Sequence, residues 1–316
     1  MALLIFEPVY QERIWGGQNL HKLFHRTIPE DKPIGESWEI CDRPEVDVKV
    51  IADGKPSSET LHSLWISDEK AKIFGTKAPQ TERFPILIKL LDAQEKLSLQ
   101  VHPPAKLAPK FKGEPKTELW YFLESTDEAN IYVGLKKGIT RKKFAAAIED
   151  KTVAECFHEI KTKNGEVMFL PSGRVHAIGG GNVILEIQQN SDTTFRVYDW
   201  DRVGQDGKPR ELHIEQSLEC IDFDDFEPIF TQRHGQSILA CKYFNIFRTD
   251  YYDKEDQDIP VTPESCRYLF AAQGNFKING EEYPRGTSLL ATADSGTLET
   301  ECLDDYGELV SVTFPQ

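Results

Sequence analysis

Short hydrophobic runs separated by polar turns recur along the whole chain. Ile86–Leu91 and Val183–Ile187 are the clearest of them. Runs of this length, rich in β-branched and other apolar side chains, are typical of buried strands. We expect further strands at Glu36–Ile40 and Val46–Ile51, and repeatedly between residues 84 and 133. The pattern predicts a protein built mainly of β-strands.

The last part of the chain repeats this strand-and-turn pattern. The runs expected to form strands there are Tyr268–Ala271, Phe276–Asn279, Thr287–Ala291, Thr297–Glu301 and Leu309–Phe314. The preceding residues 222–236 are acidic and contain proline, a composition that suits a linker. We therefore expect one domain at residues 1–235 and a second, smaller β domain at residues 236–316.

Few stretches have helical spacing. Ser57–Phe74 places its apolar residues at intervals that would align them on one face of a helix. Shorter helices are expected at Asn19–His25, after Thr140 as the N-cap residue, and at His213–Ile221. The predicted fold is thus mainly β with a few short helices.

Composition and charge exclude several classes of protein. The chain has 316 residues and is 39% hydrophobic, enough for one large or two ordinary domains. Its net charge is −15 and its cations are not clustered, which argues against a nucleic-acid partner. No apolar run approaches the roughly 20 residues of a membrane span. Met1–Pro8 lacks the basic segment of a signal peptide. We expect a cytoplasmic protein with no membrane partner.

The cysteines fit the same expectation. None of them forms a CxxC pair, and they lie far apart, at Cys41, Cys156, Cys220, Cys241, Cys266 and Cys302. In a reducing compartment such cysteines are ordinarily free thiols buried in the core.

Residues Gly165–Gly180 are the most informative stretch of the sequence. An apolar strand at Val167–Leu170 is followed by a Pro171–Gly173 turn, and His176 comes at the head of the next strand. Proline and glycine supply the backbone angles of a tight turn, so we expect a hairpin here. His176 would then point into the space that the sheet encloses.

Three further residues can join His176. Gln100 and His102 are two positions apart on an expected strand and so share a face, and Glu118 follows on another expected strand. Imidazole nitrogens and a carboxylate are ligands that zinc prefers, whereas an amide oxygen is a weaker one. The spacing outlines a metal site with His102, Glu118 and His176 as ligands. Gln100 is either the fourth ligand or a contact behind them.

A weak internal repeat links the two expected domains. The segment from Gly286 to Asp294 has the pattern of Gly165–Gly173. Eleven residues after Gly165 the chain reaches His176, whereas eleven residues after Gly286 it reaches Thr297. We expect the second domain to have the scaffold without the ligand, and hence to be metal-free.

Two levels of family resemblance follow from these motifs. Gly165–Gly180 resembles the second cupin motif, G(X)5PXG(X)2H(X)3N, with Gly180 in place of the final Asn. The first cupin motif is altered, with Gln100-x-His102 in place of His-x-His. These departures are similar to those of the type I mannose-6-phosphate isomerase family, of the short bacterial kind. The segments that carry this resemblance are Trp15–Gly17, Gly35–Glu39, Leu97–Pro103, Lys116–Tyr121 and Glu186–Arg202.

The resemblance implies both a fold and an activity. The fold would be two cupin-type jelly-roll β-barrels. The activity would be a metal-dependent aldose–ketose isomerisation that interconverts mannose 6-phosphate and fructose 6-phosphate through ring opening and a cis-enediolate proton transfer. The implied cofactor is Zn2+, one per chain, bound by Gln100, His102, Glu118 and His176. The implied partner is a small sugar phosphate.

The resemblance also implies catalytic roles. Arg196 matches a family arginine that stabilises the oxyanion or assists proton transfer; its alternative is a structural ion pair with Asp192 or Asp199. Glu186 is a candidate base that could instead face solvent. Lys116 would lie beside Glu118 and assist the base or contact sugar hydroxyls; its alternative is a structural salt bridge.

Two residues are candidates for binding the phosphate. Ser98, on the same strand face as Gln100, matches a family position near the phosphate, although it could be a strand hydroxyl without a ligand. Arg202 matches a position that often carries a lysine, and a guanidinium would offer two parallel hydrogen bonds. Tryptophans usually belong to the core rather than to a sugar platform; those concerned are Trp15, Trp38 and Trp120.

Two other functions stay open at this point. Two histidines and one carboxylate also describe a non-haem iron oxygenase. That reading would need an apolar pocket, which Lys116 and Arg196 disfavour. A sugar-phosphate-binding cupin without activity is the other alternative, and the intact set of ligands and Arg196 weighs against it.

Overall fold

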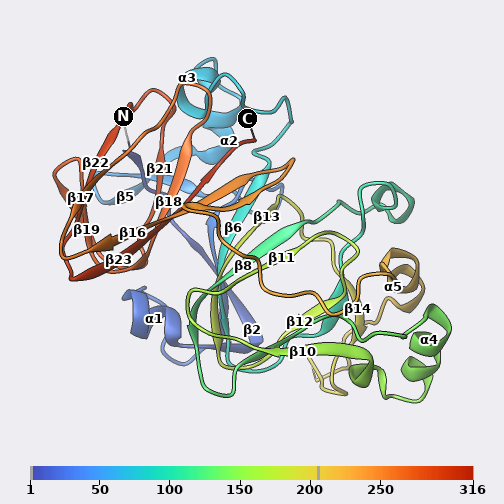
Figure 1. Ribbon diagram of the computed structural model, residues 1–316. Coiled ribbons are helices and arrows are strands. Elements are labelled where there is room, and N and C mark those ends of the chain that lie inside the picture. The colour runs from blue at the N-terminus through green and yellow to red at the C-terminus, as the bar shows by residue number, and fades with distance from the viewer. Residues whose placement is uncertain (1–2, 205–206, 316) are drawn as a thin grey trace.

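The computed structural model describes residues 3–204 and 207–315 and consists of two β-barrels with short helices at their edges (Figure 1). Each barrel is made of two antiparallel sheets. The prediction of a mainly β fold with two barrels and few short helices is confirmed.

The first barrel combines a six-stranded and a five-stranded sheet. The six-stranded sheet has the order β11 (Val167–Leu170), β8 (Glu118–Ser125), β13 (Asn182–Gln189), β6 (Ile86–Ala93), β3 (Ile34–Ile40) and β2 (Val9–Gly17). The five-stranded sheet has the order β10 (Phe157–Lys161), β9 (Asn130–Leu135), β12 (His176–Ile178), β7 (Leu99–Val101) and β14 (Phe195–Tyr198). A separate pair is formed by β4 (Lys49–Ala52) and β5 (Lys55–Thr60).

The second barrel combines a six-stranded and a four-stranded sheet. The first has the order β1 (Leu3–Leu4), β21 (Ser288–Ala291), β18 (Arg267–Gln273), β23 (Tyr306–Thr313), β16 (Asn245–Tyr252) and β15 (Ser237–Ala240). The other has the order β17 (Asp256–Ile259), β22 (Leu298–Cys302), β19 (Phe276–Ile278) and β20 (Glu281–Tyr283). Since β1 pairs with β21, the N-terminal end of the described chain joins the second barrel. The domain division at residue 235 stays a prediction.

The helices are all short. They are α1 (Asn19–Phe24), α2 (Leu61–Trp65), α3 (Lys70–Phe74), α4 (Arg141–Glu149) and α5 (Ile214–Cys220), with 3₁₀ turns at Ala108–Phe111 and Val153–Cys156. Phe144 of α4 and Cys220 of α5 share an apolar cluster with Leu99 and Val101, so these helices cover the five-stranded sheet of the first barrel. The helices expected near residues 19, 141 and 214 are confirmed, and the Thr140 hydroxyl accepts from the Lys143 N–H at 3.3 Å as an N-cap.

Alternate residues of β8 face two different cores. Trp120 and Phe122 belong to the apolar cluster inside the first barrel. Leu119 and Tyr121 belong to a second cluster, between the barrels, which also contains Val310 of β23. Burying one such side chain stabilises a fold by roughly 1.5–3 kcal/mol. The second barrel therefore packs directly against the strand wall that carries Glu118 on its inner side.

The predicted hairpin after Gly165 is wrong. β11 pairs with β8 in the six-stranded sheet, whereas β12 pairs with β7 and β9 in the other sheet. The Pro171–Gly173 turn thus carries the chain from one sheet to the other. Gly173 has φ +97° and donates its N–H to the His102 carbonyl at 3.0 Å, which ties the turn to the chain just beyond β7.

The predicted helix Ser57–Phe74 is also wrong. Its first residues end β5, and only Leu61–Trp65 and Lys70–Phe74 are helical. The later start of the first helix has a local cause at Thr60, which forms a capping box with Ser63. The Thr60 hydroxyl accepts from the Ser63 N–H at 3.1 Å, and the Ser63 hydroxyl accepts from the Thr60 N–H at 2.9 Å. A helix therefore starts after Thr60 and not before it.

Two expectations about composition can be compared with the structure. All the cysteines are free thiols, buried except for the partly exposed Cys241, as expected. In residues 3–204 and 207–315 no helix is long and apolar enough to cross a membrane. Met1 and Ala2, part of the segment considered for a signal peptide, lie outside the described residues.

Candidate active site

A polar cavity of about 450 Å³ opens between the two sheets of the first barrel. Strands of both sheets contribute to its lining, among them β6 with Lys89 and β7 with Gln100. The charged residues that line it are Glu12, Arg13, Glu36, Lys89, Lys116, Glu186, Asp192, Arg196 and Arg210. A space of this size and polarity suits a small, highly hydroxylated or anionic ligand.

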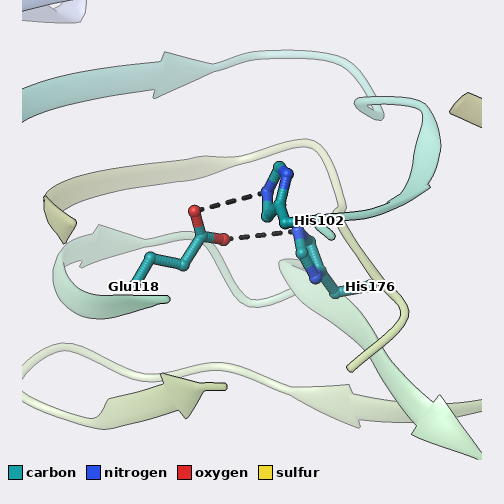
Figure 2. Close-up of side chains that lie close together, drawn as sticks. All are labelled: His102, Glu118 and His176. Atoms are coloured by element: carbon teal, nitrogen blue, oxygen red, sulfur yellow. Dashed lines mark ion pairs between the residues drawn. The ribbon is translucent and has the colours of Figure 1, made fainter. Parts of the chain in front are cut away.

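His102, Glu118 and His176 converge beside this cavity (Figure 2). Nε2 of His102 lies 3.5 Å from one Glu118 carboxylate oxygen, and Nε2 of His176 lies 3.3 Å from the other. The candidate ligand atoms of all three residues lie within 4.8 Å of one another, and all three side chains are buried. The predicted ligand set is therefore brought together.

Both imidazole rings are oriented by backbone carbonyls. Nδ1 of His102 lies 2.9 Å from the Thr193 carbonyl, and Nδ1 of His176 lies 2.9 Å from the Arg174 carbonyl. A carbonyl only accepts, so each Nδ1 carries the proton and each Nε2 presents a lone pair to the centre. Such partners are typical of the histidines that bind metals.

The charge states of the three side chains fit a metal site. Burial lowers the pKa of His176 to about 3, and burial together with Lys116 lowers the pKa of His102. Burial alone would raise the pKa of Glu118, but the Lys116 ammonium outweighs it and holds that pKa well below its usual range. Neutral imidazoles and an ionised carboxylate are the forms that bind a cation.

Two buried atoms in this cluster have no hydrogen-bond partner within the described part of the chain. They are Nε2 of His102 and Oε1 of Glu118, whereas the Lys116 ammonium lies 2.8 Å from Oε2 of Glu118. Because an unpaired buried polar atom is costly, a cation at the centre would satisfy both atoms. The residues present therefore fit a zinc-type ion.

Gln100 reaches the same centre from β7. It lies directly opposite His176 in the strand register, and its amide Nε2 is 3.4 Å from Nε2 of His176. Its Oε1 accepts from the Ser98 hydroxyl at 3.3 Å. A half-turn of the amide would present Oε1 to the centre, so the geometry suits either of the two predicted roles.

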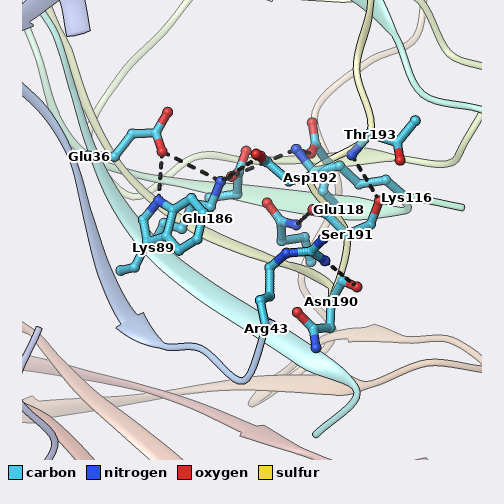
Figure 3. Close-up of polar contacts among 12 residues, drawn as sticks. Glu36, Arg43, Lys89, Lys116, Glu118, Glu186, Asn190, Ser191, Asp192 and Thr193 are labelled. Carbon is cyan, nitrogen blue, oxygen red and sulfur yellow. Dashed lines mark hydrogen bonds and ion pairs between the residues drawn. The ribbon is translucent and has the colours of Figure 1, made fainter. Parts of the chain in front are cut away.

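Lys116 and Glu186 line the cavity, and Lys116 also contacts Glu118 of the cluster (Figure 3). The Lys116 ammonium is 2.8 Å from a Glu118 oxygen and 4.0 Å from a Glu186 oxygen. The other Glu186 oxygen accepts from the Trp120 indole N–H at 3.0 Å. Glu186 is 4% exposed, so its side chain faces the barrel interior and not solvent.

Burial acts in opposite directions on the pKa values of Glu186 and Lys116. It raises the pKa of Glu186, and the positive charge of Lys116 only partly offsets this. It would lower the pKa of Lys116, but the carboxylates of Glu118 and Glu186 raise that pKa above its ordinary value. Lys116 is therefore a permanent cation, whereas Glu186 is a carboxylate of increased basicity.

Sequence reasoning missed a second buried cation. The Lys89 ammonium lies 3.6 Å from Glu36, 4.0 Å from Glu186 and 3.9 Å from Asp192 (Figure 3). Arg13 also pairs with Glu36, at 3.0 Å. The available signal was a single lysine inside the apolar run Ile86–Leu91, where an inward position would otherwise be apolar.

The three arginines near the cavity mouth differ in their placement. Arg196 lines the cavity, and its guanidinium donates to the Glu211 carbonyl at 2.7 Å. Arg202 is not among the cavity-lining residues and binds Asp199 at 3.0 Å. Arg210 also binds Asp199, at 2.7 Å through Nε, and does line the cavity. Asp199, one of the alternatives considered for Arg196, is thus shared by Arg202 and Arg210.

The remaining predicted residues surround the same space. Ser98 lines the cavity and is buried. Trp15 and Trp120 are buried and also form part of its wall. Trp38 is buried as well, and its indole N–H donates to Glu36 at 2.7 Å.

Comparisons with known proteins agree with these features. Residues 3–133 match the family described as phosphomannose isomerase type I, catalytic domain. A mannose-6-phosphate isomerase of Streptococcus mutans is 39% identical over 292 residues, which cover 89% of this chain and 88% of the relative. One from Bacillus subtilis is 38% identical over 252 residues, covering 77% and 78% of the two chains.

A solved structure extends the agreement to the whole fold. The crystal structure of a mannose 6-phosphate isomerase from Bacillus subtilis superimposes with a TM-score of 0.86 at 27% sequence identity. The match covers 99% of each chain, so it includes both barrels and not only the one that contains the cavity.

Proposed function

This chain belongs to the type I phosphomannose isomerase family, a family of isomerases, and from that premise we propose that it interconverts mannose 6-phosphate and fructose 6-phosphate. The observation that carries the proposal is the buried cluster of His102, Glu118 and His176 beside a cavity with nine charged lining residues. Lys116 and Gln100 connect the two, since each contacts the cluster and lines the cavity.

The metal that we propose for the cluster is Zn2+, one per chain. His102, Glu118 and His176 would hold it, with Gln100 as a fourth ligand. When bound, such an ion polarises and orients the oxygens of the substrate. The predicted cytoplasmic location stays a prediction.

The isomerisation moves one proton from C2 to C1 and another from O2 to O1. In the open-chain sugar a base removes the proton on C2, the electron pair of that C–H bond forms the C1–C2 double bond of a cis-enediolate, and the carbonyl oxygen on C1 takes the negative charge. The O2 hydroxyl proton then passes to O1, the electron pair left on O2 forms the C2 carbonyl, and the electron pair of the C1–C2 double bond takes the proton at C1 to give the ketose. We assign the base role to Glu186, because its carboxylate faces the cavity and burial raises its pKa.

Two cations would stabilise the enediolate oxygens. Lys116 stays protonated between Glu118 and Glu186, so it provides a fixed positive charge beside the proposed base. Arg196 provides a second positive charge from the opposite sheet, on β14. In a buried site both charges act with little screening by water.

For the phosphate we favour Arg210 over Arg202. Both guanidinium groups are held by Asp199, but only Arg210 lines the cavity. A guanidinium can bind two phosphate oxygens at once. Ser98 lines the same cavity and offers a hydroxyl donor, although it now donates to Gln100.

The cavity is unlike the one that an iron oxygenase would need. That alternative requires an apolar pocket, whereas the lining here includes four carboxylates and five cationic side chains. This lining argues against an oxygenase function.

The proposal is tested by following mannose 6-phosphate in D2O by NMR with purified protein. We expect fructose 6-phosphate to form and deuterium to appear at C1, because the base exchanges its proton with solvent. A metal-loaded protein that converts no hexose 6-phosphate would overturn the function. Conversion with no deuterium in the product at any extent of reaction would contradict the proton-transfer route and favour a hydride shift.

A further inference from the structure

The chain between β13 and β14 contacts both the candidate metal ligands and the cavity. This segment, Ser191–Thr193, supplies the carbonyl that lies 2.9 Å from Nδ1 of His102. Its middle residue, Asp192, lines the cavity and places a carboxylate oxygen 3.9 Å from the Lys89 ammonium. The orientation of His102 therefore depends on how rigidly this segment is held.

Ser191 and Thr193 fasten the segment to the loop before β8. The Ser191 hydroxyl donates to the Glu114 carbonyl at 3.1 Å. It also accepts from the Thr193 N–H at 3.2 Å (Figure 3). The Thr193 hydroxyl accepts from the Glu114 N–H at 2.9 Å. Ser191 is fully buried, so water does not compete for its hydroxyl.

The other side of the segment is fastened as well. The Asn190 side-chain amide donates to the Asp42 carbonyl at 2.7 Å and to the Phe84 carbonyl at 2.9 Å. The Gln188 amide donates to the Ser191 carbonyl at 2.7 Å. These bonds hold the backbone before the Thr193 carbonyl, and the pairing of Phe195 with Val101 of β7 holds it after that carbonyl. Held on both sides, the Thr193 carbonyl points toward His102.

We propose that Ser191 is a positioning residue for His102: its hydroxyl holds the Thr193 N–H, in the peptide just before the Thr193 carbonyl, and that carbonyl fixes the imidazole. This inference rests on the metal site of the proposed function. When the Nδ1–H of an imidazole has a rigid acceptor, the ring keeps one tautomer and one orientation. Its Nε2 lone pair is then already directed at the ion. Loss of a partner outside the ligand shell typically weakens metal binding by about 10- to 100-fold.

The test compares Ser191→Ala with Ser265→Ala. Ser265 is a close match, because it is 7% exposed and its hydroxyl donates to the Cys266 carbonyl at 2.7 Å and accepts from the Phe314 N–H at 2.9 Å. Both substitutions thus remove a buried hydroxyl that bridges two backbone groups. Ser265 lies at the second barrel, away from the ligand cluster.

The measurement is the zinc affinity of metal-free protein, by competition with a chromophoric chelator, together with the visible spectrum of the Co2+-loaded protein. We expect Ser191→Ala to bind zinc at least about 10-fold more weakly than wild type and to alter the cobalt bands. Ser265→Ala should leave both unchanged while losing similar thermal stability. Equal zinc affinities for the two variants would overturn the inference.

A second variant keeps the test decisive if Ser191→Ala does not fold. Thr193→Val removes the acceptor of the Glu114 N–H with little change of shape, and it should weaken zinc binding in the same direction. An unchanged zinc affinity in folded Thr193→Val would then overturn the inference. Wild-type protein that binds no metal would instead overturn the metal site on which the inference rests, so the two failures are distinguishable.

Discussion

The two barrels share a strand pattern but differ in what fills them. Gly165 precedes β11 and Gly286 precedes β21, both with positive φ, at +78° and +86°. The next strand of the first barrel then begins with His176, and that of the second barrel begins with Leu298. The weak repeat thus corresponds to a strand in each barrel, but Thr297, the position that it aligns with His176, lies one residue before β22.

The interiors of the two barrels differ in polarity at the first residue of β12 and of β22. Leu298 is fully buried in an apolar cluster with Phe276 and Leu289, which fills the second barrel. At the head of β12 in the first barrel, His176 contacts Glu118 instead. Polar groups at such positions cost stability unless something satisfies them. Within residues 3–204 and 207–315, the cluster of His and Glu side chains that could hold a metal lies in the first barrel, which is the barrel for which we propose the function. That the second barrel is metal-free stays a prediction.

The largest effect is expected from replacing His176 and Leu298, the first residues of β12 and β22, with alanine. His176→Ala should lower kcat by about 10³-fold or more, because a ligand of the metal centre is lost. Leu298→Ala should leave kcat within about 2-fold but cost about 2–5 kcal/mol of unfolding free energy, since it creates a cavity in a packed core. Turnover and urea unfolding of both variants measure the contrast.

The comparison would fail if the two variants behaved alike. Leu298→Ala with a large loss of kcat in its folded form would mean that the second barrel takes part in the chemistry. His176→Ala with nearly normal kcat would remove the metal centre from the mechanism.

A smaller effect, on KM, is expected from the two guanidinium groups that Asp199 binds. Arg210→Met should raise KM for mannose 6-phosphate by about 10- to 100-fold, because one charge-assisted phosphate contact is lost. Arg202→Met, which removes the other guanidinium on Asp199, should change KM by less than about 3-fold. Steady-state kinetics of the pair decide between them, and the reverse order of effects would favour Arg202 as the phosphate contact.

A further effect concerns the pH dependence of stability and the buried carboxylate of Glu36. Burial would raise its pKa, but Lys89 and Arg13 outweigh this and lower it from 4.5 to about 2. A carboxyl with a lowered folded-state pKa stabilises the fold above the unfolded pKa and loses that contribution as pH falls through the folded pKa. The shift corresponds to about 3 kcal/mol. Glu36→Gln should therefore be less stable than wild type at pH 7, and this difference should shrink between pH 4.5 and pH 2.

Chemical denaturation of wild type and Glu36→Gln across this pH range measures the contribution. Glu299→Gln, at an exposed position on β22 of the second barrel, is the control and should change stability by less than about 0.5 kcal/mol. A stability difference for Glu36→Gln that does not vary with pH would show that the ion pairs do not set it.

Much of the site was predictable from sequence because its signals are local. The Gly165–Gly180 motif, the two-residue spacing of Gln100 and His102, and the family segments together predicted the residues that converge. Turn residues and strand periodicity act over a few positions, so one sequence suffices to interpret them.

What sequence reasoning missed depends on long-range pairing. The chain crosses from one sheet to the other at Pro171, and only the pairing of β11 with β8 reveals this. β16 was missed because its central residues are polar; Arg248 reaches across to the Tyr121 hydroxyl at 3.0 Å. Sequence reasoning proposed Arg202 for the phosphate and did not consider Arg210, and only the fold shows that Arg210 lines the cavity.

The central claim is that one ion, held in the first barrel alone, is required for turnover. The most direct measurement adds Zn2+ stepwise to metal-free protein and records the rate of fructose 6-phosphate formation after each addition. We predict that the rate rises in proportion to added metal and levels off at about one equivalent per chain, with no rise in His176→Ala. Full activity in metal-free protein, or a metal requirement that persists unchanged in His176→Ala, would contradict the account.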